Sequence, residues 1–453
     1  MQQIIFILLL GITSYIAYKL YSRIFHNIMM GKPYQYQNTD KNERWRNVLL
    51  VAFGQKKMFK KWIPAVFHLF IYVAFLFTQI ELIEIIIDGL FGVHRFFAPI
   101  LGGFYTLLIS TIEILSLLAF IATITFLYRR NLLKVPRLVK SELNGWPKLD
   151  ANLILIGEFL LITGIFTMNG ADTVLQGIQP DHYPNTGSLA ISSWLGPALF
   201  GGLEPEALML LERFGWWLHL LVVLGFILYL PISKHLHIFL AFPNVYFSKL
   251  TPRGQMENMP EIMNEVKSML GFSTGDEEQV MGEEMPEFGS KDVFDLSWKN
   301  ILNAYSCTEC GRCTEVCPAN MTGKKLSPRK VMMDIRDRAE EISRNLRSGD
   351  MKYAKTQDNT DIKTLTKDNY DDGKSLFDYI TREEIHACTT CNACVEACPV
   401  LIDPLEPIMK MRRYEILSES AGPADWVPMF NSIENNGAVW QMSVEREAWR
   451  NEA

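Results

Sequence analysis

The sequence predicts an all-α protein in which a five-helix transmembrane bundle is followed by a helical domain outside the membrane. Two observations lead to this prediction. Residues 1–250 hold five long apolar stretches, whereas the rest of the chain is polar and acidic. All eight cysteines fall in the polar part, in two runs of identical spacing. The formal net charge of −6 averages two unlike halves and therefore says little about binding partners.

Five stretches are apolar enough to cross a bilayer, which takes about 20 residues of helix. They cover residues 2–21, 62–88, 99–128, 151–168 and 213–240. The first stretch has no basic segment before it and no small-residue cleavage site. We therefore interpret it as a retained helix rather than a signal peptide.

The distribution of Lys and Arg predicts the orientation of these spans, because basic loops stay on the cytoplasmic side. Segments 23–61 and 129–150 are rich in basic residues, whereas loop 89–98 has only Arg95 and loop 169–212 has none. We expect a multi-pass protein of the inner (cytoplasmic) membrane with its N-terminus outside and the cysteine domain in the cytoplasm. Reduced thiolates, which iron binding requires, also favour that compartment.

The two cysteine runs have the spacing of a two-cluster ferredoxin. They read Cys307-x2-Cys310-x2-Cys313-x3-Cys317-Pro318 and Cys388-x2-Cys391-x2-Cys394-x3-Cys398-Pro399. In such proteins each run gives three ligands to one [4Fe–4S] cluster and its fourth cysteine to the other. Cluster one is thereby assigned Cys307, Cys310, Cys313 and Cys398, and cluster two Cys388, Cys391, Cys394 and Cys317. Zinc is the alternative for paired Cys-x2-Cys motifs, but it accounts for neither the third and fourth cysteines nor the prolines.

About 70 residues separate the two runs, which predicts a helical ferredoxin rather than the compact bacterial type. We expect helices near 328–347 and 374–386, with a polar interruption at 354–372. Residues 297–403 are predicted to form this two-[4Fe–4S] domain. A polar linker with one short helix near 259–270 is expected at 251–296. Residues 404–453 are expected to be a C-terminal tail that docks a partner.

A group of basic side chains follows the first cysteine run. It consists of Lys324, Lys325, Arg329 and Lys330. The group is either a solvated face of the domain or a docking patch for an acidic partner.

Three histidines are candidates for haem ligation, because an imidazole in a membrane span is rare and usually functional. His68 and His237 lie at the same cytoplasmic depth on different spans, as the two axial ligands of haem b must. His219 and His237 are about five helical turns apart, which places them on one face with a separation of roughly 27 Å. His235 points to nearly the opposite face. Pro231 lies between His219 and His237, so the argument from helical periodicity is approximate. The alternative role for the three candidate histidines is hydrogen bonding within the bundle.

The remaining ionisable groups near the spans have less specific interpretations. His26, His94, His182 and His386 are expected to be surface or hydrogen-bonding residues. Four carboxyls, Glu81, Glu84, Glu113 and Glu158, lie within the spans. They mark either a path for protons or quinone, or hydrogen bonds between helices.

The fifth span resembles a known membrane cytochrome. Arg213–Phe247 carries Leu218-His219-Leu220, Leu230-Pro231-Ile232-Ser233-Lys234 and His237-Ile238, and it resembles the last span of the nitrate reductase gamma-subunit family of cytochromes b. Phe67-His68 resembles the start of that family's second span. The resemblance implies a five-span cytochrome b-like domain over residues 1–250 that binds two b haems and exchanges electrons with quinone. The family's second histidine on the second span is replaced here by Thr78, so His219 lacks its expected partner unless His94 or another group ligates.

The cysteine domain resembles a second group of proteins. Ser297-Trp298, Cys307-Thr308-Glu309-Cys310-Gly311-Arg312-Cys313 and Cys317-Pro318-Ala319 resemble the iron–sulfur part of heterodisulfide reductase-like proteins. The tail is similar in Met411-Arg412-Arg413-Tyr414, Phe430-Asn431-Ser432-Ile433-Glu434 and Glu447-Ala448-Trp449-Arg450. This group includes single-chain membrane-bound iron–sulfur oxidoreductases in which a catalytic region with Cys-Cys-Gly motifs follows such a tail. No such motif occurs here, which implies that the catalytic part is a separate polypeptide.

The residues and the two resemblances together predict the electron-transfer subunit of a membrane-bound iron–sulfur:quinone oxidoreductase in a respiratory chain. Electrons are expected to pass between a cytoplasmic Cys-Cys-Gly or flavoprotein subunit and membrane quinone, through two [4Fe–4S] clusters and haem b. The alternatives are a component of an electron-transfer-flavoprotein:quinone oxidoreductase, or a haem-free membrane anchor for a ferredoxin. The sequence shows no phosphate-binding glycine loop, nucleophile–base pair, nucleic-acid motif, or flavin or nicotinamide site.

Overall fold

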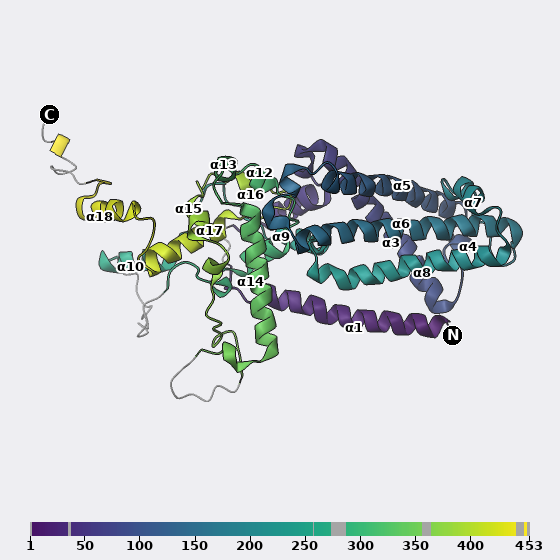
Figure 1. The fold of residues 1–453 in the computed structure, drawn as a ribbon, viewed down its shortest axis with the longest axis horizontal. Coiled ribbons are helices and arrows are strands. Elements are labelled where there is room, and N and C mark those ends of the chain that lie inside the picture. The colour runs from purple at the N-terminus through teal and green to yellow at the C-terminus, as the bar shows by residue number, and fades with distance from the viewer. Residues whose placement is uncertain are drawn as a thin grey trace. The chain divides into compact units, whose positions relative to one another are not determined.

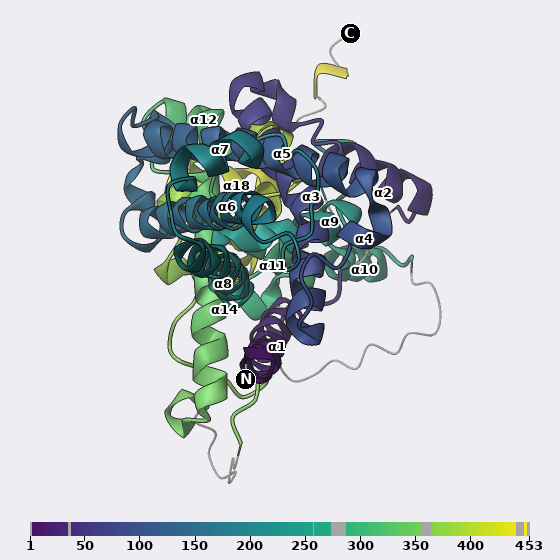
Figure 2. The ribbon, with the colours of Figure 1, turned by 90° about the vertical axis from the view of Figure 1, so that its right-hand side faces the viewer.

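A computed structural model describes residues 2–34, 38–256, 258–272, 287–355, 364–440 and 448–450. The described residues form helices and no β-strand, apart from two isolated bridges. The predicted all-α class is therefore confirmed. The chain divides into two compact units (Figures 1 and 2). The membrane unit comprises Met1–His26, Asn47–Pro243 and Tyr305–Gly311, and the ferredoxin unit comprises Asn27–Arg46, Asn244–Ala304 and Arg312–Ala453.

The membrane unit is built from five long apolar helices that lie side by side in Figure 1. They are α1 (Gln2–Ile28), α3 (Trp62–Phe91), α5 (Gly103–Asn131), α6 (Trp146–Ile178) and α8 (Pro205–Tyr229). By length and composition each can cross a membrane. Short helices α4 (Ala98–Leu101) and α7 (Ser192–Phe200) lie in the connections. The five predicted spans thus correspond to five observed helices, although the fifth differs in extent.

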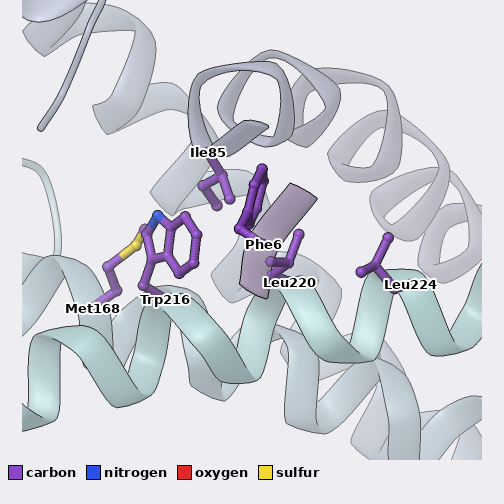
Figure 3. Packing of buried hydrophobic residues seen from close by; sticks show 6 residues of the cluster. All are labelled: Phe6, Ile85, Met168, Trp216, Leu220 and Leu224. Atoms are coloured by element: carbon purple, nitrogen blue, oxygen red, sulfur yellow. The ribbon is translucent and has the colours of Figure 1, made fainter. Parts of the chain in front are cut away.

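A buried apolar cluster joins four of these helices. Phe6 of α1 lies between Ile85 of α3 and the α8 side chains Trp216, Leu220 and Leu224 (Figure 3). The ring centroids of Phe6 and Trp216 are 5.6 Å apart. Met168 adds α6 to the cluster. Helix α1 is therefore packed into the bundle through a fully buried aromatic side chain.

Helices α6 and α8 approach so closely that glycine is required at their contact. A Cβ added to Gly215 would lie 2.5 Å from the backbone nitrogen of Met168 and 2.8 Å from the carbonyl oxygen of Gly164. Both contacts are with backbone atoms, so a side chain cannot be accommodated by a rotamer change. The bundle at this point depends on backbone-to-backbone packing.

Gly215→Ala is expected to destabilise the protein by about 1–3 kcal/mol, because the added methyl group forces the two helices apart. Gly225→Ala is the matched control on the same helix, since a Cβ there meets no atom within 4 Å. The control should be neutral or slightly stabilising, because alanine favours helix more than glycine does. Thermal unfolding of both variants in detergent measures the difference. Equal melting temperatures would mean that the two helices are not in close contact at Gly215.

The fifth span is not one continuous helix. Helix α8 ends at Tyr229 and is followed by 3-10 turns at Leu230–Ile232 and Lys234–Leu236, with Ser233 extended between them. A new helix, α9, covers His237–Tyr246. The span expected over 213–240 is therefore interrupted at Pro231, where a bend was anticipated, and at the extended Ser233. The five-turn argument that placed His219 and His237 on one helical face no longer applies.

The ferredoxin unit consists of short helices around one long helix. They are α2 (Lys41–Asn47), α10 (Pro260–Met269), α11 (Trp298–Tyr305), α12 (Arg312–Glu315), α13 (Pro318–Met321), α14 (Pro328–Ser348), α15 (Arg382–His386), α16 (Ala393–Ala397), α17 (Leu405–Arg413) and α18 (Trp426–Asn436). The helices expected near 259–270 and 328–347 are observed as α10 and α14. Linker residues 273–286, residues 356–363 and tail residues 441–447 and 451–453 lie outside the described part of the chain.

The single helix expected at 374–386 is instead two separate elements. A 3-10 turn covers Leu376–Asp378 and α15 covers Arg382–His386. Ser375 and Thr381 each form a capping box, in which the side chain accepts a backbone hydrogen bond from the new turn. Two helix starts six residues apart are incompatible with one continuous helix.

A buried arginine fixes the long helix α14 to distant parts of the ferredoxin unit. Arg338 is 1% exposed. Its guanidinium donates hydrogen bonds to Asp292 at 2.6 Å, to Asp372 at 2.6 Å and to the carbonyl oxygen of Lys374 at 3.0 Å. Such a paired, fully hydrogen-bonded buried charge holds one arrangement of the three segments.

Candidate metal centres and histidine site

Four cysteines from the two runs line one pocket of the ferredoxin unit. They are Cys317, Cys388, Cys391 and Cys394, and the apolar wall is formed by Pro318, Leu326, Pro328, Leu405 and Ile408. The fourth cysteine of the first run is thus beside the first three of the second run, which are the four residues assigned to cluster two. The backbone N–H of Thr390 points at the sulfur of Cys388, 3.4 Å away. Four thiols in an apolar pocket with an N–H···S contact fit a [4Fe–4S] cluster.

Two of these cysteines, Cys317 and Cys394, are buried, whereas Cys388 is partly exposed and Cys391 is exposed. Burial raises the pKa of Cys388 and of Cys394, and Asp403 raises that of Cys394 further. None of the eight cysteines is in a disulfide. Because iron binds the thiolate, loading of the pocket must release protons.

The ligands assigned to cluster one are divided between the two units. Cys307 and Cys310 belong to the membrane unit, whereas Cys313 and Cys398 belong to the ferredoxin unit. Within the ferredoxin unit, the backbone N–H of Ile402 donates to the sulfur of Cys398 at 3.3 Å. The joint ligation of cluster one by these four residues remains a prediction.

The loop that carries Cys307 and Cys310 is attached to the segment between α8 and α9. Glu309, with φ of 54°, forms a buried ion pair with Lys234. Glu309 is 4% exposed and Lys234 is 8% exposed. The hydroxyl of Ser306 also donates to the carbonyl oxygen of Leu240 at 3.3 Å. Sequence reasoning missed Lys234 and Glu309, since nothing local signals that residues 75 positions apart form a pair.

Lys234 is held by further groups of the membrane unit. Its Nζ donates to the carbonyl oxygen of Pro147 at 2.6 Å. Asp150 lies 3.9 Å from the same ammonium and accepts hydrogen bonds from the hydroxyls of Tyr229 and Ser233, each at 2.6 Å. Burial lowers the pKa of Lys234, and the Glu309 carboxylate opposes this effect. Asp150 thereby shapes the non-helical turn that presents Lys234 to Glu309.

Three imidazoles lie close together near this turn. The rings of His235 and His237 are 5.6 Å apart between centroids. The pKa of His235 is lowered to about 3, mainly by burial and also by the neighbouring His237 and His68. His235 was expected on the opposite helical face from His237. It lies beside His237 because the helix ends before both residues.

Hydrogen bonds orient the rings of the two predicted haem ligands. Nδ1 of His237 is 3.1 Å from the carbonyl oxygen of Lys234, and Nδ1 of His68 is 3.2 Å from Oε1 of Gln55. When Nδ1 carries the proton for such an acceptor, Nε2 is the nitrogen that can coordinate a metal. Burial also lowers the pKa of His237, which favours the neutral, ligating form.

His219 lies in the interior of the bundle. It is 1% exposed, and its Nδ1 is 3.4 Å from the carbonyl oxygen of Leu161 on α6. The hydroxyl of Thr78, at the position where the cytochrome family has a histidine, donates to the carbonyl oxygen of Phe75 at 3.2 Å. Nε2 of His94 is 2.9 Å from a carboxylate oxygen of Asp172. This nitrogen therefore does not act as the second haem ligand opposite His219.

The other histidines have the roles expected of them where the structure shows a side-chain contact. His26 bonds to the carbonyl oxygen of Ser22 at 2.7 Å, and His386 to Glu415 at 2.6 Å. The ring of His386 also contacts Trp426 at 5.0 Å between centroids. These interactions are structural.

The buried carboxyls of the spans fall into two kinds. Glu84 accepts a hydrogen bond from the Tyr105 hydroxyl at 2.7 Å, and Glu113 accepts from two backbone N–H groups at the start of α7, at 2.7 and 3.1 Å. These two connect helices and loops, as the structural alternative predicts. Among the described residues, neither oxygen of the buried Glu81 has a hydrogen-bond partner, and the guanidinium of Arg95 lies 4.0 Å from Oε1. Glu158 is partly exposed on α6. A role in a path for protons or quinone stays a prediction for these two carboxyls.

The basic group after the first cysteine run is not one exposed patch. Arg329 is 0% exposed. Lys330 is ion-paired with Asp334 at 2.7 Å, and Lys325 is paired with Glu383 at 2.5 Å. The docking-patch interpretation is wrong for Arg329, which is buried, and it stays a prediction for the exposed Lys324 and Lys325.

Comparison with known proteins identifies the class to which the cysteine site belongs. Residues 306–402 match the family model of the 4Fe–4S dicluster domain. The predicted iron–sulfur clusters are thus supported and the zinc alternative is not. The chain therefore combines a two-cluster iron–sulfur domain with five helices that are apolar enough to cross a membrane.

The curated relatives of the chain are iron–sulfur and quinone oxidoreductases. It is 29% identical over 440 residues to the probable iron-sulfur-binding oxidoreductase FadF of Bacillus subtilis, covering 94% of this chain and 57% of that protein. It is 26% identical over 414 residues to the EtfAB:quinone oxidoreductase of Syntrophomonas wolfei, covering 88% and 53%. A probable membrane-anchored ferredoxin of Chromohalobacter salexigens is 29% identical over 169 residues, which are 36% of this chain and 24% of that protein. The chain spans about half the length of the first two relatives. No solved structure matches it.

Proposed function

We propose that this chain is the electron-transfer subunit of a membrane-bound iron–sulfur:quinone oxidoreductase of the inner membrane. Electrons pass between a redox partner in the cytoplasm and quinone in the bilayer, by way of two [4Fe–4S] clusters and haem b. Reduction of quinone takes two electrons and two protons, whereas each metal centre carries one electron. A series of such centres joins the two reactions, and the protein fixes their distances and tunes their potentials.

The observation that carries this proposal is the attachment of the first cysteine run to the histidine segment. The loop with Cys307 and Cys310 folds as part of the membrane unit. Lys234, which pairs with Glu309 of that loop, lies three residues before His237 and offers its carbonyl oxygen to the His237 ring. A cluster on these cysteines would therefore be close to the histidines, as transfer of electrons between the two requires.

The histidines of the membrane unit fit haem b in chemistry and in orientation. We propose His68 and His237 as axial ligands of the cytoplasmic-side haem, since both Nδ1 atoms face oxygen acceptors. The bound haem would supply a one-electron carrier within the bilayer. His219 is the candidate ligand for a second haem, for which Thr78 provides no partner.

His237→Ala tests this ligand assignment. The variant is expected to lose the b-type absorption of the reduced protein while the paramagnetic signals of the clusters remain. His26→Ala is the control, because that exposed histidine bonds only within α1. His235→Ala separates the two neighbouring rings: loss of haem in this variant and not in His237→Ala would transfer the ligand role to His235. A purified wild-type protein with no b-type spectrum at all would leave the haem-free membrane anchor as the function.

The identity of the cytoplasmic partner is proposed from the relatives. Similarity to the EtfAB:quinone oxidoreductase over 88% of the chain favours an electron-transfer flavoprotein as the electron donor. A Cys-Cys-Gly iron–sulfur protein is the second candidate. Affinity purification of the chain from its native membrane decides between them, according to whether a flavoprotein or a Cys-Cys-Gly protein is recovered with it.

A further inference from the structure

Helix α11 of the ferredoxin unit carries a buried lysine whose direct partners are all uncharged. Lys299 is 3% exposed. Its Nζ donates hydrogen bonds to Oδ1 of Asn244 at 2.7 Å and to Oδ1 of Asn303 at 2.6 Å. Among the described residues, no carboxylate forms an ion pair with this ammonium. A buried charge without a counter-ion costs several kcal/mol, so the protein must gain something from it or balance it by another group.

Three acidic groups act on the ammonium of Lys299. Burial is the main cause that brings the pKa of Lys299 down to about 7, and Glu406, then Asp403 and then Cys398 act in the opposite direction. Glu406 is already paired with Lys410 at 3.1 Å. Asp403 accepts the backbone N–H groups of residues 405 and 406 at the start of α17, at 2.9 and 3.1 Å. Each carboxylate therefore has a partner of its own besides Lys299, and Cys398 is the remaining acidic group of the three.

Asn244 links the lysine to the loop that carries Cys398. Its Oδ1 accepts from Lys299, and its Nδ2 donates to the carbonyl oxygen of Val400 at 2.8 Å. Val400 is two residues after Cys398. The amide thus fixes the position of the ammonium with respect to this cysteine. Without iron, Cys398 is a neutral thiol or a single thiolate. A cluster ligated by four thiolates carries more negative charge in the same place.

We propose that Lys299 is the countercharge of the [4Fe–4S] cluster that Cys398 ligates, and that it raises the reduction potential of this cluster. Each electron added to a cluster increases its negative charge by one, and cluster potentials depend on nearby charge and solvent exposure. A buried cation therefore stabilises the reduced cluster more than the oxidised one. The inference rests on Cys398 as a cluster ligand and does not require haem, quinone or the partner subunit.

Lys299→Met tests the proposal, because methionine keeps the length of the side chain and removes its charge. The full-length protein, purified anaerobically in detergent, is titrated with reductant and followed by electron paramagnetic resonance. For the Cys398 cluster, the ratio of reduced to oxidised form at a given potential should fall about tenfold, equivalent to about 59 mV for one electron. The reduction potential of the other cluster should be unchanged. The signal of that other cluster, to which Cys317 is assigned, is the one that disappears in Cys317→Ala.

Three further variants complete the test. Lys299→Arg retains the charge and should retain most of the wild-type potential. Asn303→Asp leaves the lysine in place but puts a carboxylate beside it, so it should lower the potential of the same cluster even if Lys299→Met fails to fold. Lys352→Met removes an exposed lysine, with 62% of its side chain accessible, and should shift neither cluster.

The proposal is overturned if the Cys398 cluster keeps its potential in both Lys299→Met and Asn303→Asp, or if the two clusters shift equally. These outcomes are independent of the proposed function. Clusters that titrate as expected in a protein without haem or quinone activity would support the role of Lys299 and refute the electron path to quinone.

Discussion

Replacement of Cys317 by alanine is expected to remove the cluster held mainly by the second cysteine run, although Cys317 belongs to the first run. The physical reason is the shared pocket, in which Cys317 lies with Cys388, Cys391 and Cys394. Without its fourth thiolate, cluster two is expected to be lost, and the variant is compared with the wild type after the same anaerobic purification. Iron and acid-labile sulfide should fall by about half, from about eight to about four atoms of each per chain, for two [4Fe–4S] clusters.

The matched comparison is with single variants of each run. Cys317→Ala and Cys388→Ala should lose the same paramagnetic signal, and Cys307→Ala and Cys398→Ala should both lose the other one. Circular dichroism checks that the helical content is kept. If Cys317→Ala and Cys307→Ala instead lose the same signal, each run holds its own cluster and the crossed ligation is wrong.

The regular parts of this protein could be predicted from its sequence because they follow from local patterns. Apolar stretches of sufficient length identified the five long helices of the membrane unit, since a span needs only composition and length. The spacing of the cysteines assigned Cys317 to the cluster of the second run, and this cysteine does lie in one pocket with Cys388. Helix α14 was predicted almost to the residue, and the structure shows Ser327 as its N-cap, Pro328 in its first turn and Gly349 at its C-cap.

The predictions that failed concern features that depend on contacts between residues far apart in the chain. The end of α8 at Tyr229 is fixed by Asp150 of α6, which bonds to the hydroxyls of Tyr229 and Ser233. Periodicity alone continued the helix and therefore placed His235 on the wrong face. The pair between Lys234 and Glu309 could not be foreseen at all, because an ionic contact between distant positions leaves no pattern in the sequence.

Breaking the buried pair of Lys234 and Glu309 is expected to destabilise the membrane unit strongly. Glu309→Gln removes the main counter-ion of Lys234 while its ammonium stays buried, and loss of one partner of a buried pair costs about 3–5 kcal/mol. Lys234→Met likewise leaves the buried Glu309 carboxylate without its counter-ion. The double variant should be more stable than the sum of the two losses, because neither charge is then left uncompensated. Denaturant unfolding of the full chain in detergent measures the free energy of unfolding of the wild type, the two single variants and the double variant.

The same variants separate a positioning role from a purely structural one. If the pair holds the Cys307–Cys310 loop at the histidine segment, the rate at which reduced clusters pass electrons to haem should fall at least about tenfold in Glu309→Gln, since misplacement by as little as about 1 Å is costly to catalysis. The haem spectrum and cluster content should stay at wild-type levels. The exposed Lys352–Asp350 pair provides the control, and its removal should alter neither stability nor rate. Normal transfer in a destabilised Glu309→Gln protein would restrict the pair to folding, and the cysteine loop would then need another anchor beside His237.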